Sequence, residues 1–141
     1  MPKDSNPCDP RQIRDMQKRS AEWLKQADYD LDTAGYMYTG GRYPYAVFIS
    51  HLAVEKALKG LYYEKRQQIP PKSHSLQYLL NEIGIKPPPS HGKFIIKLSE
   101  ASIPTRYPED LEKMKKDFAP EAVGDVLMKA KEVIQWIKKQ L

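Results

Sequence analysis

Residues 43–63 read YPYAVFISHLAVEKALKGLYY, and most of these side chains are apolar or aromatic. They cover nearly every side of a helix, which is typical of a helix buried among other helices or at a subunit interface. The stretch therefore predicts the central helix of a bundle. Its few polar groups are informative, because burying an unpaired polar group is costly. His51, Glu55 and Lys59 follow one another at spacings of four and so line one face.

The composition is that of one globular domain. The chain has 141 residues, of which 40% are hydrophobic and 29% charged, with a net charge of +5. We expect a single domain over residues 1–141, with residues 1–9 as a flexible N-terminal tail. The positive charge permits anionic partners without requiring them. Cys8 is the lone cysteine, so no internal disulfide can form. Because the chain also lacks a membrane-spanning run and a signal peptide, we expect a cytoplasmic location.

Helical periodicity continues on both sides of the central stretch. A stripe of apolar residues at spacings of three and four comprises Trp23, Ala27, Leu31, Ala34 and Tyr38. It predicts a long first helix from about Arg11 to the pair Gly40-Gly41. The central helix should end in the polar run 64–68. A short connection makes the two helices antiparallel neighbours. Small residues of the central helix, such as Gly60, mark a face that a neighbouring backbone can approach closely.

The second half of the chain predicts shorter helices. Ser73 or Ser75 caps a third helix that ends at Gly84, Ser90 caps a fourth, and Pro120 opens the last. Residues 103–108 are not expected to form a regular helix, because they contain two prolines. Residues 110–118 fit either a helical turn or an exposed charged loop. The fold class predicted is all-α, an up-and-down bundle of four to five helices.

The sequence lacks the motifs of several classes of functional site. The chain contains no phosphate-binding loop, no dinucleotide fingerprint and no HExxH motif. Its three histidines, His51, His74 and His91, share no metal-ligand spacing. We therefore predict no metal and no cofactor.

The polar residues that remain allow two interpretations. The face of His51, Glu55 and Lys59 could bind an anion or carry out proton chemistry, or it could form a satisfied polar network in the bundle. Lys56 and Lys59 could meet phosphate.

Outside the central helix, Arg106 and Tyr107 suit phosphate contact and base stacking, although Arg106 could instead pair with an acidic group in a loop. The residue types alone favour a capping role for His74.

At these positions the chain resembles the HEPN family (higher eukaryotes and prokaryotes nucleotide-binding domain), in its minimal stand-alone bacterial or archaeal form. The resemblance spans about residues 13–140. Four segments carry it, WLKQADYDL at 23–31, GRYPYAVFISHLAVEKALK at 41–59, PKSHSL at 71–76 and TRYP at 105–108.

The resemblance implies a HEPN-like bundle that forms a homodimer and pairs with a small nucleotidyltransferase protein. It also implies nucleotide binding, and some members are ribonucleases of toxin–antitoxin systems. By position, the family's polar signature falls on His51, Glu55, Lys56, Lys59, His74, Arg106 and Asp30.

The ribonuclease branch of the family carries an arginine followed, after four to six residues, by a histidine. Here eight residues separate Arg42 from His51, seven separate Arg66 from His74, and no histidine follows Arg106. The chain thus resembles the branch without nuclease activity, and we predict no catalytic residue.

Three functional hypotheses follow. The first is a module that binds a nucleotide, a partner nucleotidyltransferase, or both, as half of a toxin–antitoxin pair. The second is a metal-independent ribonuclease toxin that acts on RNA through His51 and Arg106. The third is a structural dimerisation or interaction bundle. The first is favoured, and no membrane partner is expected.

Overall fold

A computed structural model describes the backbone of residues 10–141 and the side chains of residues 19–141. The predicted tail, residues 1–9, lies outside the described residues. The helices, in chain order, are α1 (Pro10–Thr39), α2 (Tyr43–Arg66), α3 (Leu76–Ile83), α4 (Pro89–Arg106), α5 (Leu111–Asp117) and α6 (Pro120–Lys139). The described residues contain no strand, which confirms the all-α prediction. None of these helices is long and apolar enough to cross a lipid bilayer.

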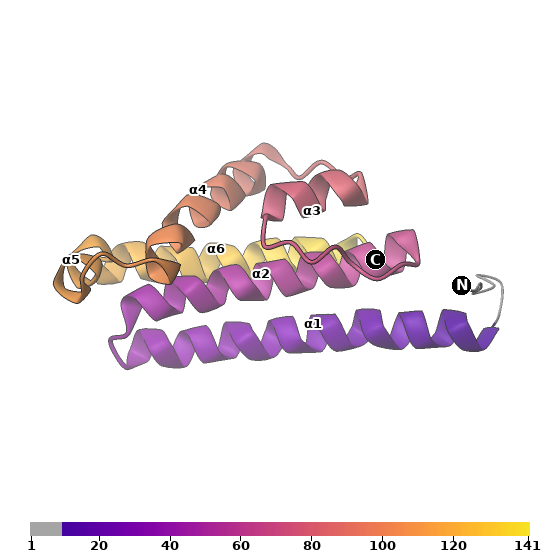
Figure 1. Cartoon of the computed structure of the whole chain (residues 1–141), viewed down its shortest axis with the longest axis horizontal. Coiled ribbons are helices and arrows are strands. Elements are labelled where there is room, and N and C mark those ends of the chain that lie inside the picture. The colour runs from indigo at the N-terminus through magenta and orange to yellow at the C-terminus, as the bar shows by residue number, and fades with distance from the viewer. Residues whose placement is uncertain (1–9) are drawn as a thin grey trace.

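The two longest helices form an antiparallel hairpin. Gly41 connects them with a φ of 76°, a left-handed conformation that glycine adopts at little cost. α6 runs alongside this hairpin, α3 and α4 cover the side of α2 that faces away from α1, and α5 closes one end (Figure 1). α2 contacts every other helix, so its position explains its apolar sequence.

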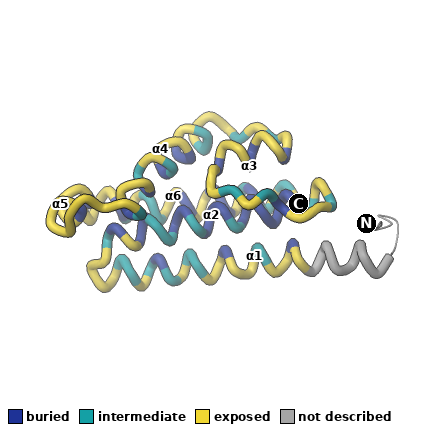
Figure 2. Tube along the Cα trace, viewed as in Figure 1, coloured by how far each residue is buried: buried dark blue, intermediate teal, exposed yellow. Residues whose placement is uncertain are grey.

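The core is built around α2, as its sequence predicted. Buried residues are concentrated along α2, whereas α1 and α6 bury one stripe each (Figure 2). Val54, Leu58 and Leu61 have no exposed surface. Each such side chain contributes about 1.5–3 kcal/mol by leaving water.

Close packing at Gly60 joins α2 to α1. A Cβ atom at Gly60 would lie 3.2 Å from the Ser20 carbonyl oxygen and 3.2 Å from Trp23 Cβ. The Ser20 hydroxyl donates a hydrogen bond of 2.8 Å to the Gly60 carbonyl. The predicted close approach of a neighbouring backbone is therefore confirmed.

α3 begins and ends as its local sequence predicted. The Ser75 hydroxyl accepts from the Tyr78 backbone N–H at 3.2 Å, and Gly84 ends the helix with a φ of 82°. Arg66, at the end of α2, donates to the carbonyls of Glu82 and Ile83. These bonds hold α3 against α2.

The predicted bounds of α4 were wrong at both ends. The helix begins at Pro89 without a side-chain cap, so Ser90 lies inside it. It also continues through Pro104 to Arg106, where the sequence had indicated a break. Pro104 deprives the Glu100 carbonyl of a partner, but Glu100 is exposed and water can replace the missing bond. The helix ends two residues later, so little of it depends on that bond.

The segment after α4 is helical rather than an exposed loop. Asp110 caps α5 by accepting from the Lys113 backbone N–H at 2.7 Å, and Met114 is buried. This helix accounts for the difference between the six helices of the described chain and the four to five expected.

Candidate functional site

Glu55 is the centre of the polar face on α2. The residue is 3% exposed, and its carboxylate accepts from Lys59 Nζ at 3.0 Å. His74 Nδ1 lies 3.1 Å from both carboxylate oxygens, and His51 Nδ1 lies 4.0 Å from one of them. A buried carboxylate needs such partners, because an uncompensated charge is costly in the interior. The three residues predicted on one face of α2 therefore form a satisfied polar cluster that also includes His74.

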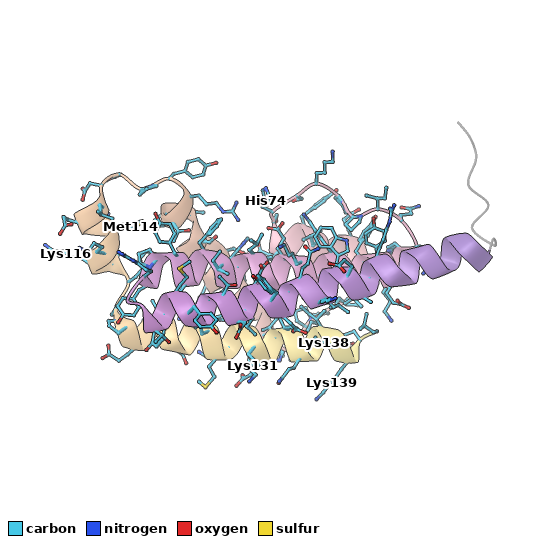
Figure 3. All side chains as sticks on the ribbon, turned by 90° about the horizontal axis from the view of Figure 1, so that it is seen from below. His74, Met114, Lys116, Lys131, Lys138 and Lys139 are labelled. Atoms are coloured by element: carbon cyan, nitrogen blue, oxygen red, sulfur yellow. The ribbon has the colours of Figure 1, made fainter. Side chains whose placement is uncertain are left out.

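His74 belongs to this cluster rather than to a helix cap. Ser75 supplies the cap of α3, so the favoured capping role of His74 was wrong. The loop between α2 and α3 places the His74 ring against Glu55 while 67% of its side chain stays exposed. Figure 3 shows it projecting from that loop. His74 thus links the buried carboxylate to the surface.

Two lysines of the central helix, Lys56 and Lys59, point toward α1. Lys56 Nζ lies 2.9 Å from an Asp30 carboxylate oxygen, and both side chains are largely buried. Lys59 Nζ, besides its bond to Glu55, lies 5.7 Å from the centre of the Trp23 ring. Each ammonium group already has a carboxylate partner. The structure thus brings Asp30 and Lys56 together on the α1 side of α2.

Arg106 meets His51 on the other side of the polar face. Arg106 Nη2 lies 3.4 Å from His51 Nδ1, and the guanidinium lies over the Phe48 ring at 5.0 Å. A guanidinium can only donate, so His51 Nδ1 accepts and the ring proton sits on Nε2.

Burial and the neighbouring guanidinium keep His51 neutral. Burial is the larger cause and the charge of Arg106 the second, and together they lower the pKa of His51 to about 4. Glu55 opposes this shift, and His74 adds to it. At neutral pH the ring is therefore an uncharged imidazole.

The guanidinium of Arg106 borders an open depression on the surface. Tyr45, Phe48, Thr105, Arg106 and Tyr107 line a volume of about 400 Å³. Tyr107 is 78% exposed and Tyr45 48%. Arg106 forms no ion pair with any residue whose side chain the structure describes. The alternative of a loop arginine paired with an acidic group was therefore wrong. Arg106 lies in a helix, and no acidic side chain of the described residues pairs with it.

Phe48 lines the depression but was not predicted as a site residue. Phe48 lies three positions before His51, so helical spacing places it beside the polar face. That spacing was the available signal. It was masked because aromatic residues in so apolar a helix are usually core.

The residues predicted for the site therefore separate into two groups. Asp30 of α1 meets Lys56, and Lys59 also points toward α1. Arg106 and Tyr107 line the depression, and His51, Glu55 and His74 lie between the two groups. No three His, Cys, Asp or Glu residues of the described region gather as metal ligands would.

Fold and site together define an all-helical bundle whose central helix carries a buried His–Glu–Lys line. The HEPN domain family matches residues 20–140 of this chain, which therefore belongs to that family. No curated protein matches the chain.

Two solved structures share the fold. TT1696 from Thermus thermophilus is 28% identical, with a TM-score of 0.77 over 87% of this chain and 98% of its own. ST0689, described as an archaeal HEPN homologue, is 31% identical, with a TM-score of 0.70 over 86% of this chain and 97% of its own.

Proposed function

We propose that this HEPN domain binds a nucleotide at the Arg106 face, defined as Tyr45, Phe48, His51, Arg106 and Tyr107. The observation that carries the proposal is the Arg106 guanidinium. It is half-buried, held by His51 and Phe48, and has no carboxylate partner in the described part of the chain. A positioned cation of this kind suits an anionic ligand, and arginine is well shaped for phosphate.

The aromatic residues around Arg106 favour a nucleotide over a simple anion. Tyr45 and Tyr107 are exposed beside the guanidinium and offer flat surfaces for a base. Stacking of a base on such a side chain contributes about 1–3 kcal/mol. In this arrangement the guanidinium contacts phosphate while a tyrosine supports the base.

The remaining residues of the family signature hold the face in place. His74 holds the Glu55 carboxylate next to His51, and His51 in turn accepts a hydrogen bond from Arg106. Lys56 and Lys59 are matched by Asp30 and Glu55. Their role in this proposal is to fix α2 against α1 rather than to contact phosphate.

The state of His51 supports binding over RNA cleavage. A general acid must be protonated at the working pH, and a general base works best with a pKa near that pH. A histidine with a pKa of about 4 satisfies neither condition at neutral pH. Its Nδ1 is also occupied by the Arg106 hydrogen bond.

Calorimetric titration tests the proposal. ATP, AMP and GTP are titrated into the wild type and into Arg106→Ala, and the variant should bind at least about tenfold more weakly, the loss expected for a charge-assisted contact. Lys97→Ala is the matched control, because Lys97 is exposed on α4 and lies half a turn away from Arg106 around the helix. Equal affinity of Arg106→Ala and Lys97→Ala contradicts the proposal, as does a wild type that binds no nucleotide.

A protein partner is the second candidate, supported by apolar surface next to the Arg106 face. Ile103, Tyr107 and Leu111 are 58%, 78% and 59% exposed. Ile103 and Tyr107 also border a hollow of about 260 Å³ between α4 and α5. Exposed apolar groups gathered beside a charged site are typical of protein contacts.

We propose a small nucleotidyltransferase as this partner, in a toxin–antitoxin pair, because the family resemblance implies it. Mixing the chain with a nucleotidyltransferase encoded beside it should give a complex in size-exclusion chromatography, and Ile103→Asp should weaken that complex. An unchanged elution profile counts against this partner. A complex that forms without any nucleotide binding would favour the purely structural alternative.

A further inference from the structure

The side chain of His74 is held in place although most of it is exposed to solvent. Its Nδ1 atom lies 3.1 Å from both carboxylate oxygens of Glu55. That carboxylate is buried, whereas 67% of the His74 side chain is exposed. An exposed side chain normally loses conformational freedom when it binds a ligand. Because Glu55 fixes the imidazole in advance, His74 has less freedom left to lose.

The contact with Glu55 also determines which nitrogen of His74 is free. An ionised carboxylate can only accept, so Nδ1 carries the proton of this hydrogen bond. Nε2 has no partner in the part of the chain that the structure describes. In the neutral ring Nε2 has a lone pair, and in the imidazolium it carries a second N–H. The imidazolium can therefore donate to Glu55 through one nitrogen and to an anion through the other.

The charges around His74 favour an anion. Glu55 is the only acidic residue within ion-pair distance of His74 among the described residues, and it already neutralises Lys59 at 3.0 Å. His51 is uncharged at neutral pH, and Arg106 is a cation. A proton on His74 therefore gives this part of the surface a net positive charge.

A short series of contacts connects Arg106 to His74. Arg106 Nη2 lies 3.4 Å from His51 Nδ1, and that nitrogen lies 4.0 Å from Glu55 Oε1. The same oxygen lies 3.1 Å from His74 Nδ1. Because neighbouring distances share an atom, Arg106 Nη2 and His74 Nδ1 cannot be farther apart than the total of the three. Figure 3 shows the loop that carries His74 and the segment after α4 on the same edge of the molecule, opposite α6.

We propose that His74 is a second anion contact, which makes the Arg106 face a site for a nucleoside di- or triphosphate in preference to a monophosphate. The inference rests on the proposed nucleotide binding at that face. Arg106 contacts one phosphate, and a phosphate farther along the chain accepts from Nε2 of the His74 imidazolium while Glu55 holds Nδ1. Two cations at separate points match the several anionic groups of a polyphosphate, whereas a monophosphate offers only one.

Binding of a polyphosphate is linked to protonation in this arrangement. Neutral His74 has no N–H at Nε2, so the ligand selects the imidazolium. Histidine is the side chain whose charge changes between about pH 5 and pH 8. The affinity for a polyphosphate should therefore fall as the pH rises through this range, beyond any change seen for a monophosphate.

Calorimetric titration of ATP and AMP tests the proposal. His74→Asn is the informative variant, because its amide can still donate to Glu55 as Nδ1 does, but it has no charge and no counterpart of Nε2. At about pH 6, where histidine is largely protonated, the wild type should bind ATP at least about tenfold more tightly than AMP, the effect of one charge-assisted hydrogen bond. His74→Asn should bind the two nucleotides about equally. His74 is exposed, so the fold should survive, and circular dichroism checks that it does.

His91→Asn is the matched control. His91 precedes Arg106 by about four turns of α4, and no carboxylate of the described residues pairs with it. This variant should keep the wild-type preference for ATP. Titrations at about pH 8 give a second readout, because the preference should shrink in the wild type and stay unchanged in His74→Asn. The protonation of ATP itself is common to both proteins and cancels in the comparison.

Equal losses of ATP and AMP affinity in His74→Asn would show that His74 acts only by positioning Glu55, and they would overturn the proposal. An unchanged preference for ATP in His74→Asn would also overturn it. In both cases nucleotide binding at the Arg106 face stands.

Inorganic triphosphate, which has no base, separates the two proposals in the opposite direction. If it binds the wild type as tightly as ATP does and binds His74→Asn more weakly, the His74 contact stands, while the preference of the site for a nucleotide fails. A wild type that binds none of these ligands overturns both proposals.

Discussion

Arg106 Nη2 lies 3.4 Å from His51 Nδ1, although the two residues are 55 positions apart in the chain. This contact joins the last turn of α4 to the middle of the central helix. It fixes the tautomer of the histidine and helps to keep it uncharged. It also positions the guanidinium at the edge of the depression. The neutral form of His51 and the position of the Arg106 guanidinium at the depression therefore depend on the same contact. The pKa of His51 and the binding of an anion by Arg106 can both be measured.

Acid should destabilise the fold through His51. Its pKa is about 4 in the folded chain, below the 6.5 of an ordinary histidine. Between these values the unfolded chain binds a proton that the folded chain does not, so stability rises with pH. Linkage gives a loss of about 2 kcal/mol between about pH 7 and pH 5. Urea unfolding at the two pH values measures it.

His51→Asn is the control for this effect, because its side-chain oxygen can still accept from Arg106 but cannot titrate. The pH-dependent loss should be smaller in His51→Asn by about 2 kcal/mol, the contribution assigned to the histidine. Carboxylates that titrate in the same range contribute equally to both proteins and cancel in the comparison. Identical losses in the two proteins would show that His51 is not the group responsible.

Removal of Arg106 should raise the pKa of His51. The guanidinium is the second cause of the lowered pKa, after burial. In Arg106→Ala the pKa should therefore move upward from about 4 but stay below 6.5, because burial remains. Titration of the His51 ring by NMR measures the shift. Arg106→Lys keeps a positive charge nearby and should give a smaller rise, whereas no rise in Arg106→Ala would contradict the contact.

Local sequence signals predicted most of the helices. The apolar run of residues 43–63 identified α2. Gly41 and Gly84 marked helix ends through their backbone preferences, and Ser75 marked one through its capping side chain. The continuation of α4 through Pro104 was not predictable in this way. Its cost depends on whether the Glu100 carbonyl can reach water, and that exposure is a property of the folded chain.

The candidate site was predictable as a set of residues but not as an arrangement. Spacing placed His51, Glu55 and Lys59 on one face, and the family resemblance added residues from other segments. Neither could show that His74 reaches Glu55 or that Lys56 turns to Asp30, because those contacts depend on how α1 and the α2–α3 loop pack on α2. Pairing partners decide which charges remain available to a ligand.

Glu55 should be essential for stability because it is the counter-ion of a buried lysine. Glu55→Gln leaves Lys59 without its carboxylate and should cost about 3–5 kcal/mol, the usual cost of breaking a buried pair. Glu55→Gln combined with Lys59→Met removes both charges and should recover part of that loss. Glu112→Gln is the control, since its pair with Lys115 is exposed and should contribute less than about 1 kcal/mol. Urea unfolding of these variants and the wild type measures the differences.

Two glycine substitutions should change stability in opposite directions. Gly60→Ala places a methyl group 3.2 Å from the Ser20 carbonyl oxygen and should cost about 1–3 kcal/mol, because backbone cannot easily move aside. Gly92→Ala on α4 meets its nearest atom at 3.7 Å and should gain up to about 1 kcal/mol from helix propensity. Thermal unfolding compares them. If Gly60→Ala were as stable as the wild type, α1 and α2 could not pack as closely as described.

Tyr107 should contribute to nucleotide affinity through its ring rather than its hydroxyl group. It is 78% exposed beside Arg106, so its removal should leave the fold intact while a bound base loses a stacking surface. Tyr107→Ala should weaken nucleotide binding by about 1–3 kcal/mol, whereas Tyr107→Phe should bind almost as well as the wild type. Tyr78→Ala, an exposed tyrosine on α3, is the control and should change nothing. Inorganic pyrophosphate, which has no base, should bind Tyr107→Ala and the wild type equally. A loss of pyrophosphate binding in Tyr107→Ala would show that the residue supports Arg106 instead of stacking on a base.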